Sequence, residues 1–213
     1  MRAARRRDPE GTRLTILDAA EAIFVEKGFA AASMSDIAAR AMVTKSLIHH
    51  HFGSKEELWL EVKRRSLDEY VKAQRAIMAS AAADQESFTE SLRVYFRFLE
   101  RNPNYVRLST WMNLEDPKLS APANPDLLHR GVERLRKAQA QGVFRRDVDP
   151  WHIMFAFFAV STYWFQARHA HGHDVYADRD AGAADEKFLD DMLKILLEGV
   201  TPRAPLSQPR SPP

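Results

Sequence analysis

The sequence contains no cysteine, which excludes a disulfide framework and thiol chemistry and fits the reducing cytoplasm. It also has no long apolar run. The longest, residues 153–160, has eight residues, whereas a membrane-spanning helix needs about 20. The first residues contain no apolar segment of the kind found in signal peptides. We therefore expect a cytoplasmic protein with no membrane partner.

Motifs of common enzyme chemistries are missing as well. The sequence has no G-x-S-x-G nucleophile motif, no phosphate-binding P-loop and no pair of carboxylates whose spacing places them in one cleft. No catalytic residue and no cofactor is implied, so an enzyme is disfavoured. The composition is otherwise globular, 45% hydrophobic and 28% charged, and 213 residues suffice for a small domain plus a larger one.

Positive charge is concentrated near the N-terminus. Residues 1–55 carry nine Lys or Arg and six Asp or Glu, whereas the whole chain has a net charge of only +2. Four arginines precede the first acidic residue. This distribution indicates a local surface for a polyanion. We expect residues 1–11 to form a disordered basic arm, and both contact with DNA and a solvated tail remain open for it.

Residues 33–57 combine two short helical patterns with the start of a third helix. Ser35 is a candidate N-cap for the first helix. A turn at residues 42–44 separates it from a second helix, Lys45–Phe52, and Ser54 begins an S-x-x-E capping box. Helices this short need another helix to pack on. Two short helices joined by a tight turn are typical of the helix–turn–helix arrangement.

An amphipathic helix is predicted just upstream, over residues 12–27, and Gly28 follows it as a helix-ending residue. The stretch ILDAAEAIFVEKGFAAASMSDIAARAMVTKSLIHHHFGSKEEL, within residues 12–58, resembles the DNA-binding domain of the TetR/AcrR family of bacterial transcriptional regulators. Met42 stands where the family usually has glycine, and His49 where it usually has tyrosine. Because a left-handed helix end favours glycine by about 1 kcal/mol, we expect a turn that is slightly strained or differently closed.

The turn and the second short helix carry most of the residues predicted to contact DNA. With Ile48 and Phe52 facing inward, the first residues of this helix would enter the major groove. The residues predicted to contact base edges are Lys45, Ser46 and Leu47. Those predicted to contact phosphates are Ser35, Thr44, His49, His50 and Lys55. Consecutive helical residues point about 100° apart, so we expect no metal site at residues 49–51.

The rest of the chain, residues 58–200, is predicted to be helical. A long helix begins at Ser54 and extends to about Ala83, and another covers residues 87–101. Asn/Asp-Pro pairs, which are helix-start signals, begin three more helices. These pairs are Asn102-Pro103, Asn124-Pro125 and Asp149-Pro150. Residues 201–213 contain five prolines and are predicted to form a disordered tail.

The helix predicted over residues 151–169 is apolar on all sides, and the last helix, residues 184–198, also has an excess of apolar positions. Such helices must be buried on two sides, which we interpret as packing on their own bundle and on a second copy of the chain. A helix–turn–helix reader of palindromic DNA also requires a dimer. The residues assigned to the dimer interface are Phe157, Val160, Trp164, Leu189, Met192, Leu193 and Leu196.

Aromatic residues recur on several helical segments of this half and are typical of apolar ligand pockets. In the family that the chain resembles, such a pocket binds a small effector that changes the separation of the DNA-reading helices. The alternative for each residue is core packing. The residues assigned to effector binding are Tyr95, Phe98, Trp111, Phe155, Phe158 and Tyr163. Because no cluster of charges is evident inside the bundle, we expect a mostly apolar or aromatic effector.

A run of alternating histidines, His169, His171 and His173, follows the apolar helix. In extended chain it admits a metal site, but we favour a polar helix end, where cations suit the helix dipole.

The sequence and the resemblance together predict an all-α protein. An N-terminal three-helix helix–turn–helix DNA-binding domain, residues 12–57, is joined to a larger C-terminal helical ligand-binding and dimerisation domain, residues 58–200. The predicted function is a homodimeric repressor that a small effector releases from a palindromic operator in double-stranded DNA. The alternatives are an activator of the same fold and a helical module that binds DNA without sequence preference.

Overall fold

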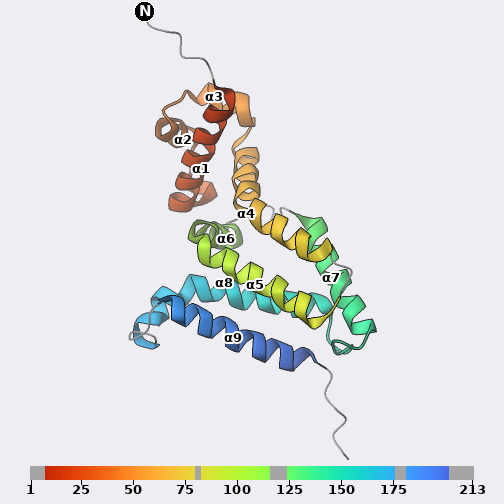
Figure 1. Ribbon diagram of the computed structural model, residues 1–213. Coiled ribbons are helices and arrows are strands. Elements are labelled where there is room, and N and C mark those ends of the chain that lie inside the picture. The colour runs from red at the N-terminus through yellow and green to blue at the C-terminus, as the bar shows by residue number, and fades with distance from the viewer. Residues whose placement is uncertain (1–7, 80–82, 116–123, 176–180, 202–213) are drawn as a thin grey trace, which may run out of the picture. The chain divides into compact units, whose positions relative to one another are not determined.

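The computed structural model of the chain describes residues 8–79, 83–115, 124–175 and 181–201. Within these residues all regular secondary structure is α-helical, which confirms the all-α prediction (Figure 1). The helices in chain order are α1 (Pro9–Ala31), α2 (Met34–Ala41), α3 (Lys45–Phe52), α4 (Lys55–Ala79), α5 (Gln85–Arg101), α6 (Pro103–Leu114), α7 (Pro125–Ala140), α8 (Pro150–Val175) and α9 (Ala181–Val200).

The helices form two compact units. The first comprises residues 1–69 and 102–123, and the second comprises residues 70–101 and 124–213. Helix α4 therefore contributes to both. Helix α6 packs against α1 in the first unit, although it lies in the half of the sequence predicted to form the C-terminal domain.

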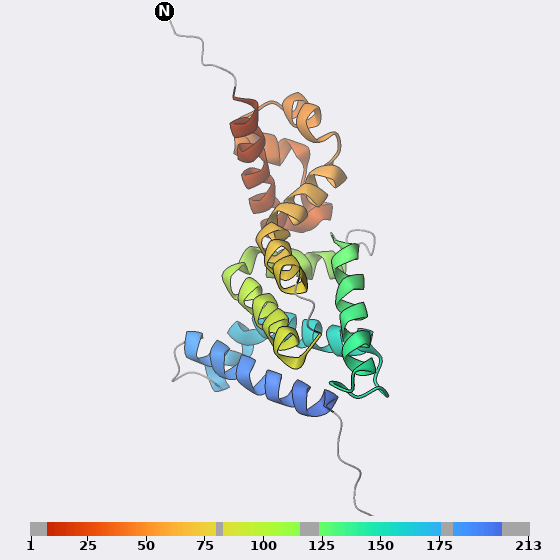
Figure 2. The same ribbon diagram turned by 45° about the vertical axis from the view of Figure 1, so that its right-hand side comes forward.

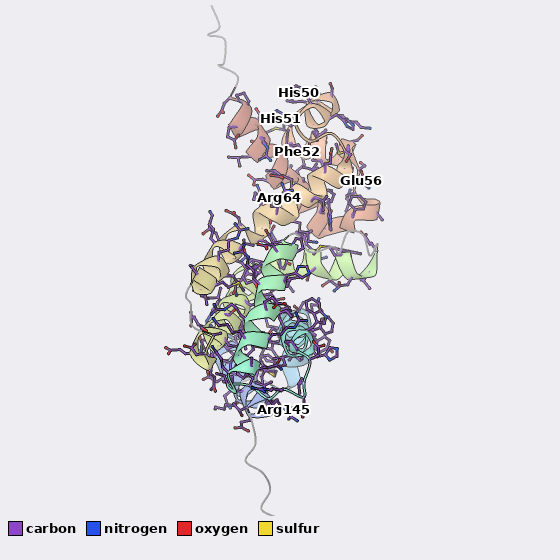
Figure 3. All side chains as sticks on the ribbon, turned by 90° about the vertical axis from the view of Figure 1, so that its right-hand side faces the viewer. His50, His51, Phe52, Glu56, Arg64 and Arg145 are labelled. Atoms are coloured by element: carbon purple, nitrogen blue, oxygen red, sulfur yellow. The ribbon has the colours of Figure 1, made fainter. Side chains whose placement is uncertain are left out.

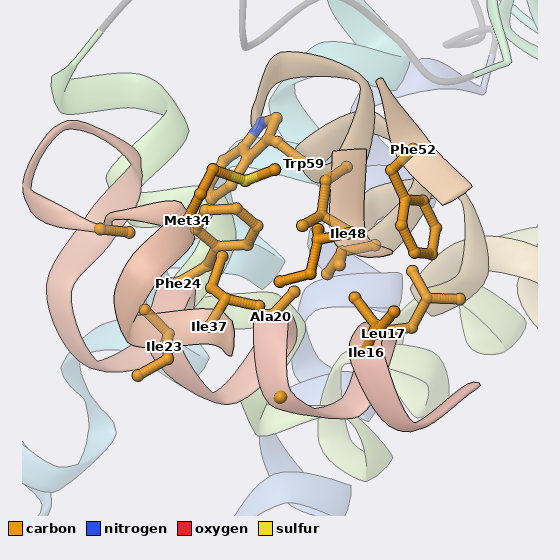
Figure 4. Close-up of a cluster of buried hydrophobic side chains, with 14 of the residues drawn as sticks. Ile16, Leu17, Ala20, Ile23, Phe24, Met34, Ile37, Ile48, Phe52 and Trp59 are labelled. Carbon is orange, nitrogen blue, oxygen red and sulfur yellow. The ribbon is translucent and has the colours of Figure 1, made fainter. Parts of the chain in front are cut away.

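The core of the first unit joins α1 to both short helices (Figure 4). Ile16 and Phe24 of α1 are fully buried, as are Ile37 of α2 and Ile48 of α3. The Phe24 ring packs edge-on against Trp59 of α4, with the ring centroids 4.9 Å apart. Because α2 and α3 have only eight residues each, neither is stable alone, and this shared core holds them on α1.

Four of the helix starts coincide with an Asn/Asp-Pro pair. Helices α6, α7 and α8 begin at the proline of the three predicted pairs. Asp8-Pro9 is a fourth pair, and α1 begins at Pro9 rather than at residue 12. The Asp8 carboxylate caps this helix by accepting a hydrogen bond from the Gly11 N–H (3.0 Å). Residues 9–11 are thus helical rather than part of a disordered arm. Residues 1–7 and 202–213 of the predicted arm and tail lie outside the described residues.

Gly28 interrupts α1 near its C-terminal end. Its backbone angles, φ 77° and ψ −178°, are not helical. A Cβ atom at this position would lie 2.4 Å from Oε1 of Glu115 and 2.9 Å from the Trp111 ring. Only glycine accepts both this backbone conformation and this approach. The interruption of α1 is therefore the place where the end of α6 meets it.

In the second unit α5, α8 and α9 pack against one another, and α7 packs on α8 (Figures 1 and 2). Phe96 of α5, Phe157 of α8 and Leu189 of α9 are fully buried. Trp164 of α8 stacks on Phe188 of α9, with the ring centroids 4.0 Å apart. Among the described residues no helix combines the length and the apolar content that a membrane span requires.

Candidate nucleic-acid interface and ligand pocket

The turn between α2 and α3 is closed by a regular pattern of hydrogen bonds. The Val43 N–H donates to the Ala38 carbonyl (3.0 Å) and the Met42 N–H to the Ala39 carbonyl (3.3 Å). This pair of bonds defines a Schellman helix end. Met42 adopts the left-handed conformation, φ 53° and ψ 41°, that glycine usually supplies. The turn therefore has the hydrogen bonds of an ordinary Schellman helix end, and Met42 adopts the strained left-handed conformation.

Ser33, not Ser35, caps α2, which corrects the predicted cap. Its hydroxyl accepts from the Asp36 N–H (3.1 Å), and the Asp36 carboxylate accepts from the Ser33 N–H (3.3 Å). This reciprocal capping box forms because an acidic residue lies three positions after Ser33 and none lies three after Ser35. The bond from Ser33, together with Lys27, lowers the pKa of Asp36. A carboxylate thus lies beside Ser35 and opposes a phosphate contact there.

The outer face of α3 presents the residues predicted to contact base edges. Lys45 and Ser46 are exposed and Leu47 is half-buried, because Ile48 on the opposite face enters the core. Thr44 caps the helix by accepting a hydrogen bond from the Leu47 N–H (3.2 Å). Its hydroxyl hydrogen can still be donated to a phosphate. None of the eight residues of α3 is acidic, so this face and the helix N-terminus both favour an anion.

Two histidines of α3 are exposed, and the structure fixes the ring of one of them. Nδ1 of His49 lies 2.7 Å from the Gly53 carbonyl oxygen. A carbonyl oxygen only accepts, so Nδ1 carries the hydrogen of the neutral ring and Nε2 carries none. Nε2 can donate to a phosphate only when the ring is protonated. His50, labelled in Figure 3, is exposed, and its ring packs edge-on against that of His51.

Lys55 occupies a different environment from the one predicted. Its Nζ donates to the carbonyls of Phe29 (2.8 Å) and Ala32 (3.0 Å) and lies 4.3 Å from the centroid of the Phe29 ring. These carbonyls follow the interruption at Gly28, where helical hydrogen bonding ends. Lys55 thus holds the segment from Phe29 to Ala32, and its predicted phosphate contact stays a prediction.

Arg40 is a further exposed cation on α2 that the sequence pattern does not single out. Its Nη1 lies 3.7 Å from Oε2 of Glu26, and both side chains are more than half exposed. An ion pair of this length and exposure contributes little. A basic residue two positions before the turn is the only signal that the sequence offers for it.

The second unit contains a pocket of about 670 Å³, including the open space at its mouth. Side chains from α4, α5, α7 and α8 line it, together with Phe144 from the α7–α8 connection. Most are apolar. The lining residues with polar groups are Tyr70, Gln74, Asp84, Ser87, Ser91 and Arg134. A largely apolar pocket lined by a few polar groups is typical of a small-molecule site.

Among the residues predicted to bind an effector, Phe158 lines this pocket. Tyr95 and Phe98 support the pocket region as core residues instead. The Tyr95 ring packs 4.6 Å from the Phe158 ring, and its hydroxyl is hydrogen-bonded to that of Thr162 (2.9 Å). Phe98 is buried against Tyr70, which itself lines the pocket.

The other three predicted effector residues do not line this pocket. Trp111 belongs to the first unit, where its indole N–H donates to the Val25 carbonyl (3.3 Å). Phe155 and Tyr163 of α8 are 60% and 61% exposed. The sequence shows that α8 is apolar on all sides but does not show which side faces the bundle.

The residues predicted to form the dimer interface likewise differ in how exposed they are. Phe157, Leu189 and Leu193 are buried in the core of their own unit, which leaves them little surface for a partner. Trp164 is half-buried and donates to the Asp185 carboxylate (2.7 Å). Val160 is exposed, and Met192 and Leu196 are half-buried. Ile195 of α9 is a large apolar residue that is 66% exposed.

No group of three or more potential metal ligands occurs among the residues that the structure describes. Helix α8 continues to Val175, beyond the end predicted near residue 169. The side chains of His169, His171 and His173 lie outside the described residues.

Two capped helices joined by a closed turn, held on a third helix and carrying a basic outer face, define a helix–turn–helix protein. Residues 16–62 match the family model described as bacterial regulatory proteins of the tetR family. Residues 90–190 match the model of a tetracyclin repressor-like C-terminal domain. The chain belongs to the TetR family and is a DNA-binding transcriptional regulator, not an enzyme.

Known proteins of this type resemble the chain over different lengths. The transcriptional activator FasR of Mycolicibacterium smegmatis is 34% identical over 93 residues, which are 44% of this chain and 42% of FasR. The transcriptional repressor NicS of Pseudomonas putida is 25% identical over 198 residues, 88% of this chain and 93% of NicS. The crystal structure of SCO4942 from Streptomyces coelicolor has the same fold, with a TM-score of 0.70 and 24% identity, covering 91% of this chain and 99% of that one.

Proposed function

We propose that this regulator binds a palindromic operator as a homodimer in the cytoplasm and that a small molecule bound in the second unit releases it. The observation that supports operator binding is the outer face of α3, which has exposed basic and hydroxyl groups and no acidic residue. Lys45 can donate to guanine O6 and N7, and Ser46 to several bases. Leu47 can contact a thymine methyl group. Thr44, His49 and His50 would contact phosphates.

A homodimer is supported by an exposed apolar face in the second unit. Phe155, Val160 and Tyr163 of α8 are exposed, and so is Ile195 of α9. Helices α8 and α9 pack against each other. Large exposed apolar side chains on adjacent helices are typical of a protein–protein interface. Two copies joined through this face would supply the two reading helices that a palindrome requires.

Repression is favoured over activation by the extent of the similarity. The match to the repressor NicS covers 88% of this chain, whereas the match to the activator FasR covers 44%. Activation by the same fold is the second candidate, because the position of an operator relative to its promoter can reverse the outcome of binding.

Operator binding is tested by fluorescence anisotropy on tiled DNA fragments that flank the gene, at low and at physiological salt. Lys45→Ala is measured beside the wild type. Lys137→Ala is the matched control, because Lys137 is an exposed lysine of α7 in the second unit. We expect tight binding to one near-palindromic fragment, with Lys45→Ala losing about 1–3 kcal/mol of discrimination against altered bases.

Equal, salt-sensitive binding to all fragments would favour a module without sequence preference. In that case a genome-wide selection for bound DNA decides the question. Recovery of one palindrome supports the proposed function, and recovery of unrelated sequences overturns it.

A further inference from the structure

The imidazole ring of His49 is held in place by the end of α3. Its Nδ1 donates to the Gly53 carbonyl (2.7 Å), and the Gly53 N–H donates to the His49 carbonyl (2.9 Å). Gly53 has φ 74°, a backbone conformation that favours glycine. The position of the Gly53 carbonyl, and with it the orientation of the His49 ring, is therefore set by the backbone at the helix end.

A neutral imidazole has a single N–H, and at His49 the Gly53 carbonyl accepts it. Nε2 then only accepts, as the oxygens of a phosphate do, so the neutral ring cannot donate to DNA in this orientation. Moving the hydrogen to Nε2 would place two acceptors, Nδ1 and the carbonyl oxygen, against each other. The protonated ring has two N–H groups and can donate to the carbonyl and to a phosphate at once. Protonation is therefore required for both contacts together.

His49 lies on α3 where a phosphate contact is expected. Residues four apart share a helix face, so His49 lies one turn after Lys45 on the same side of α3. The first turn of a reading helix contacts base edges, and a residue one turn later lies nearer the phosphates that border the groove. His49 is exposed and belongs to the last turn of α3, where the helix dipole favours a cation. A phosphate and the helix end thus both favour the charged ring.

The other charged and titratable groups around α3 have structural contacts or do not change charge near neutral pH. They are His50 and His51 of α3, Asp36 and Arg40 of α2, Lys55, Glu56 and Glu57 of α4, and Arg13 of α1, which lies over the Phe52 ring. Asp36 and Glu57 accept from backbone N–H groups at helix starts, and Lys55 donates to carbonyls. In model peptides carboxylates titrate near pH 4, and lysine and arginine above pH 10. Of this set, the histidines are therefore the groups that change charge between about pH 6 and 7.5.

We propose that operator binding takes up a proton at His49, so that affinity for DNA rises as the pH falls from 7.5 to 6.0. This inference rests on the proposed function, since it concerns the regulation of the same DNA contact. The sign follows from linkage. A phosphate beside Nε2 stabilises the protonated ring in the complex, so the complex binds this proton more tightly than the free protein, and a lower pH favours the complex. Operator occupancy is thereby coupled to acidification.

Fluorescence anisotropy of the full-length protein on the operator, between pH 6.0 and 7.5 at constant ionic strength, tests this coupling. The series ends at pH 7.5 because burial lowers the pKa of Lys63 to about 8. We expect wild-type affinity to be about threefold to tenfold higher at pH 6.0 than at pH 7.5. His49→Gln supplies an amide that donates to a phosphate at every pH, so its affinity should change less than twofold over this range.

His129→Gln is the matched control. His129 of α7 is also exposed, and its Nδ1 lies 2.8 Å from the Pro125 carbonyl oxygen, four residues earlier. It has the same kind of ring contact as His49 but belongs to the second unit. We expect this variant to keep the whole wild-type rise in affinity. A rise that is equal in the wild type and in His49→Gln, or one that both variants lose equally, would overturn the proposal.

Isothermal titration calorimetry of operator binding at pH 7.0, in two buffers with different ionisation enthalpies, counts the protons directly. We expect the wild type and His129→Gln to take up the same fraction of one proton, and His49→Gln to take up less. The wild-type count does not depend on how well a variant folds. Binding of the wild type without any proton uptake contradicts the proposal.

The same measurements separate this inference from the proposed function. One operator bound equally at pH 6.0 and 7.5 supports the proposed function and overturns the proton uptake. Binding to all DNA fragments alike, with proton uptake that His49→Gln abolishes, has the opposite meaning, because a phosphate contact does not require a specific sequence.

Discussion

The carboxylate of Glu115 accepts a hydrogen bond from the backbone N–H of Phe29, at 2.9 Å, across 86 positions of sequence. It also accepts one from the Ala30 N–H (3.2 Å). Lys55 donates to the carbonyls of Phe29 and Ala32 in the same segment. The connection between α1 and α2 is therefore held at its amides by the end of α6 and at its carbonyls by the start of α4. This connection positions α2, on which the reading helix α3 depends.

Replacing Glu115 by alanine should loosen this connection. The variant loses two charge-assisted hydrogen bonds, worth about 1–3 kcal/mol. We expect the amides of Phe29 and Ala30 to exchange with solvent roughly tenfold faster or more in native-state hydrogen exchange. Glu133→Ala is the control, because that glutamate is exposed and pairs with Arg136 on one face of α7. Unchanged protection of the two amides in the Glu115 variant would show that α6 does not hold them.

Much of the helix–turn–helix segment is predictable from sequence because its signals are local. The Lys45–Phe52 helix and its buried Ile48 follow from spacing alone, and both are found as predicted. The contact of Glu115 with Phe29 has no such signal, since its partners are far apart in the chain. The same holds for Lys55, which a surface pattern marks as exposed but which tertiary contacts use as a cap.

Met42 carries backbone strain that a single substitution should relieve. It has φ 53° and is 91% exposed, so its side chain contributes little packing. A left-handed conformation costs a residue with a Cβ about 1 kcal/mol more than glycine. We expect Met42→Gly to raise the free energy of unfolding by up to about 1 kcal/mol, measured by urea denaturation. Met42→Ala keeps the Cβ and should give no comparable gain. An equal effect of both variants would locate the cause in the side chain rather than in the backbone.

Lys63 makes the stability of the first unit depend on pH. It is only 5% exposed, and burial lowers its pKa from 10.5 to about 8. Between these two values the unfolded chain binds a proton that the folded chain has lost, so stability should rise as the pH increases from about 8 to 10.5. Below pH 8 both states are protonated, and folding bears the full cost of the buried charge. We expect Lys63→Met to stabilise the protein at pH 7 by about 1–3 kcal/mol and to remove the rise.

Urea denaturation at a series of pH values between 7 and 10.5 measures the effect of Lys63. The control is Lys137→Met, in which the replaced lysine is exposed. If the free energy of unfolding of Lys63→Met rises with pH in parallel with that of the wild type, the rise comes from titrating groups other than Lys63.

The second unit shows what a sequence pattern leaves open. The excess of apolar positions in α8 and α9 predicts that both helices are buried on two sides. Periodicity does not assign one side to the bundle and the other to a partner. Phe157, predicted to face a second subunit, is fully buried, whereas Phe155, predicted to face a ligand, is 60% exposed. The contacts of α8 with α5, α7 and α9 decide the orientation, and these depend on how the whole unit packs.

From the side of α8 that is exposed, we derive a prediction about the dimer. Phe155→Glu places a charge on the exposed face of α8, where it would be buried and unpaired in a homodimer. We expect this variant to fold but to sediment as a monomer in analytical ultracentrifugation, and to lose most of its operator affinity because one half-site holds it weakly. Phe157→Ala instead removes a fully buried ring and should lower the free energy of unfolding by about 3–5 kcal/mol. Leu114→Glu, at an exposed apolar residue of α6 in the first unit, is the control for adding a surface charge. A Phe155→Glu protein that remains dimeric would exclude this face of α8 as the interface.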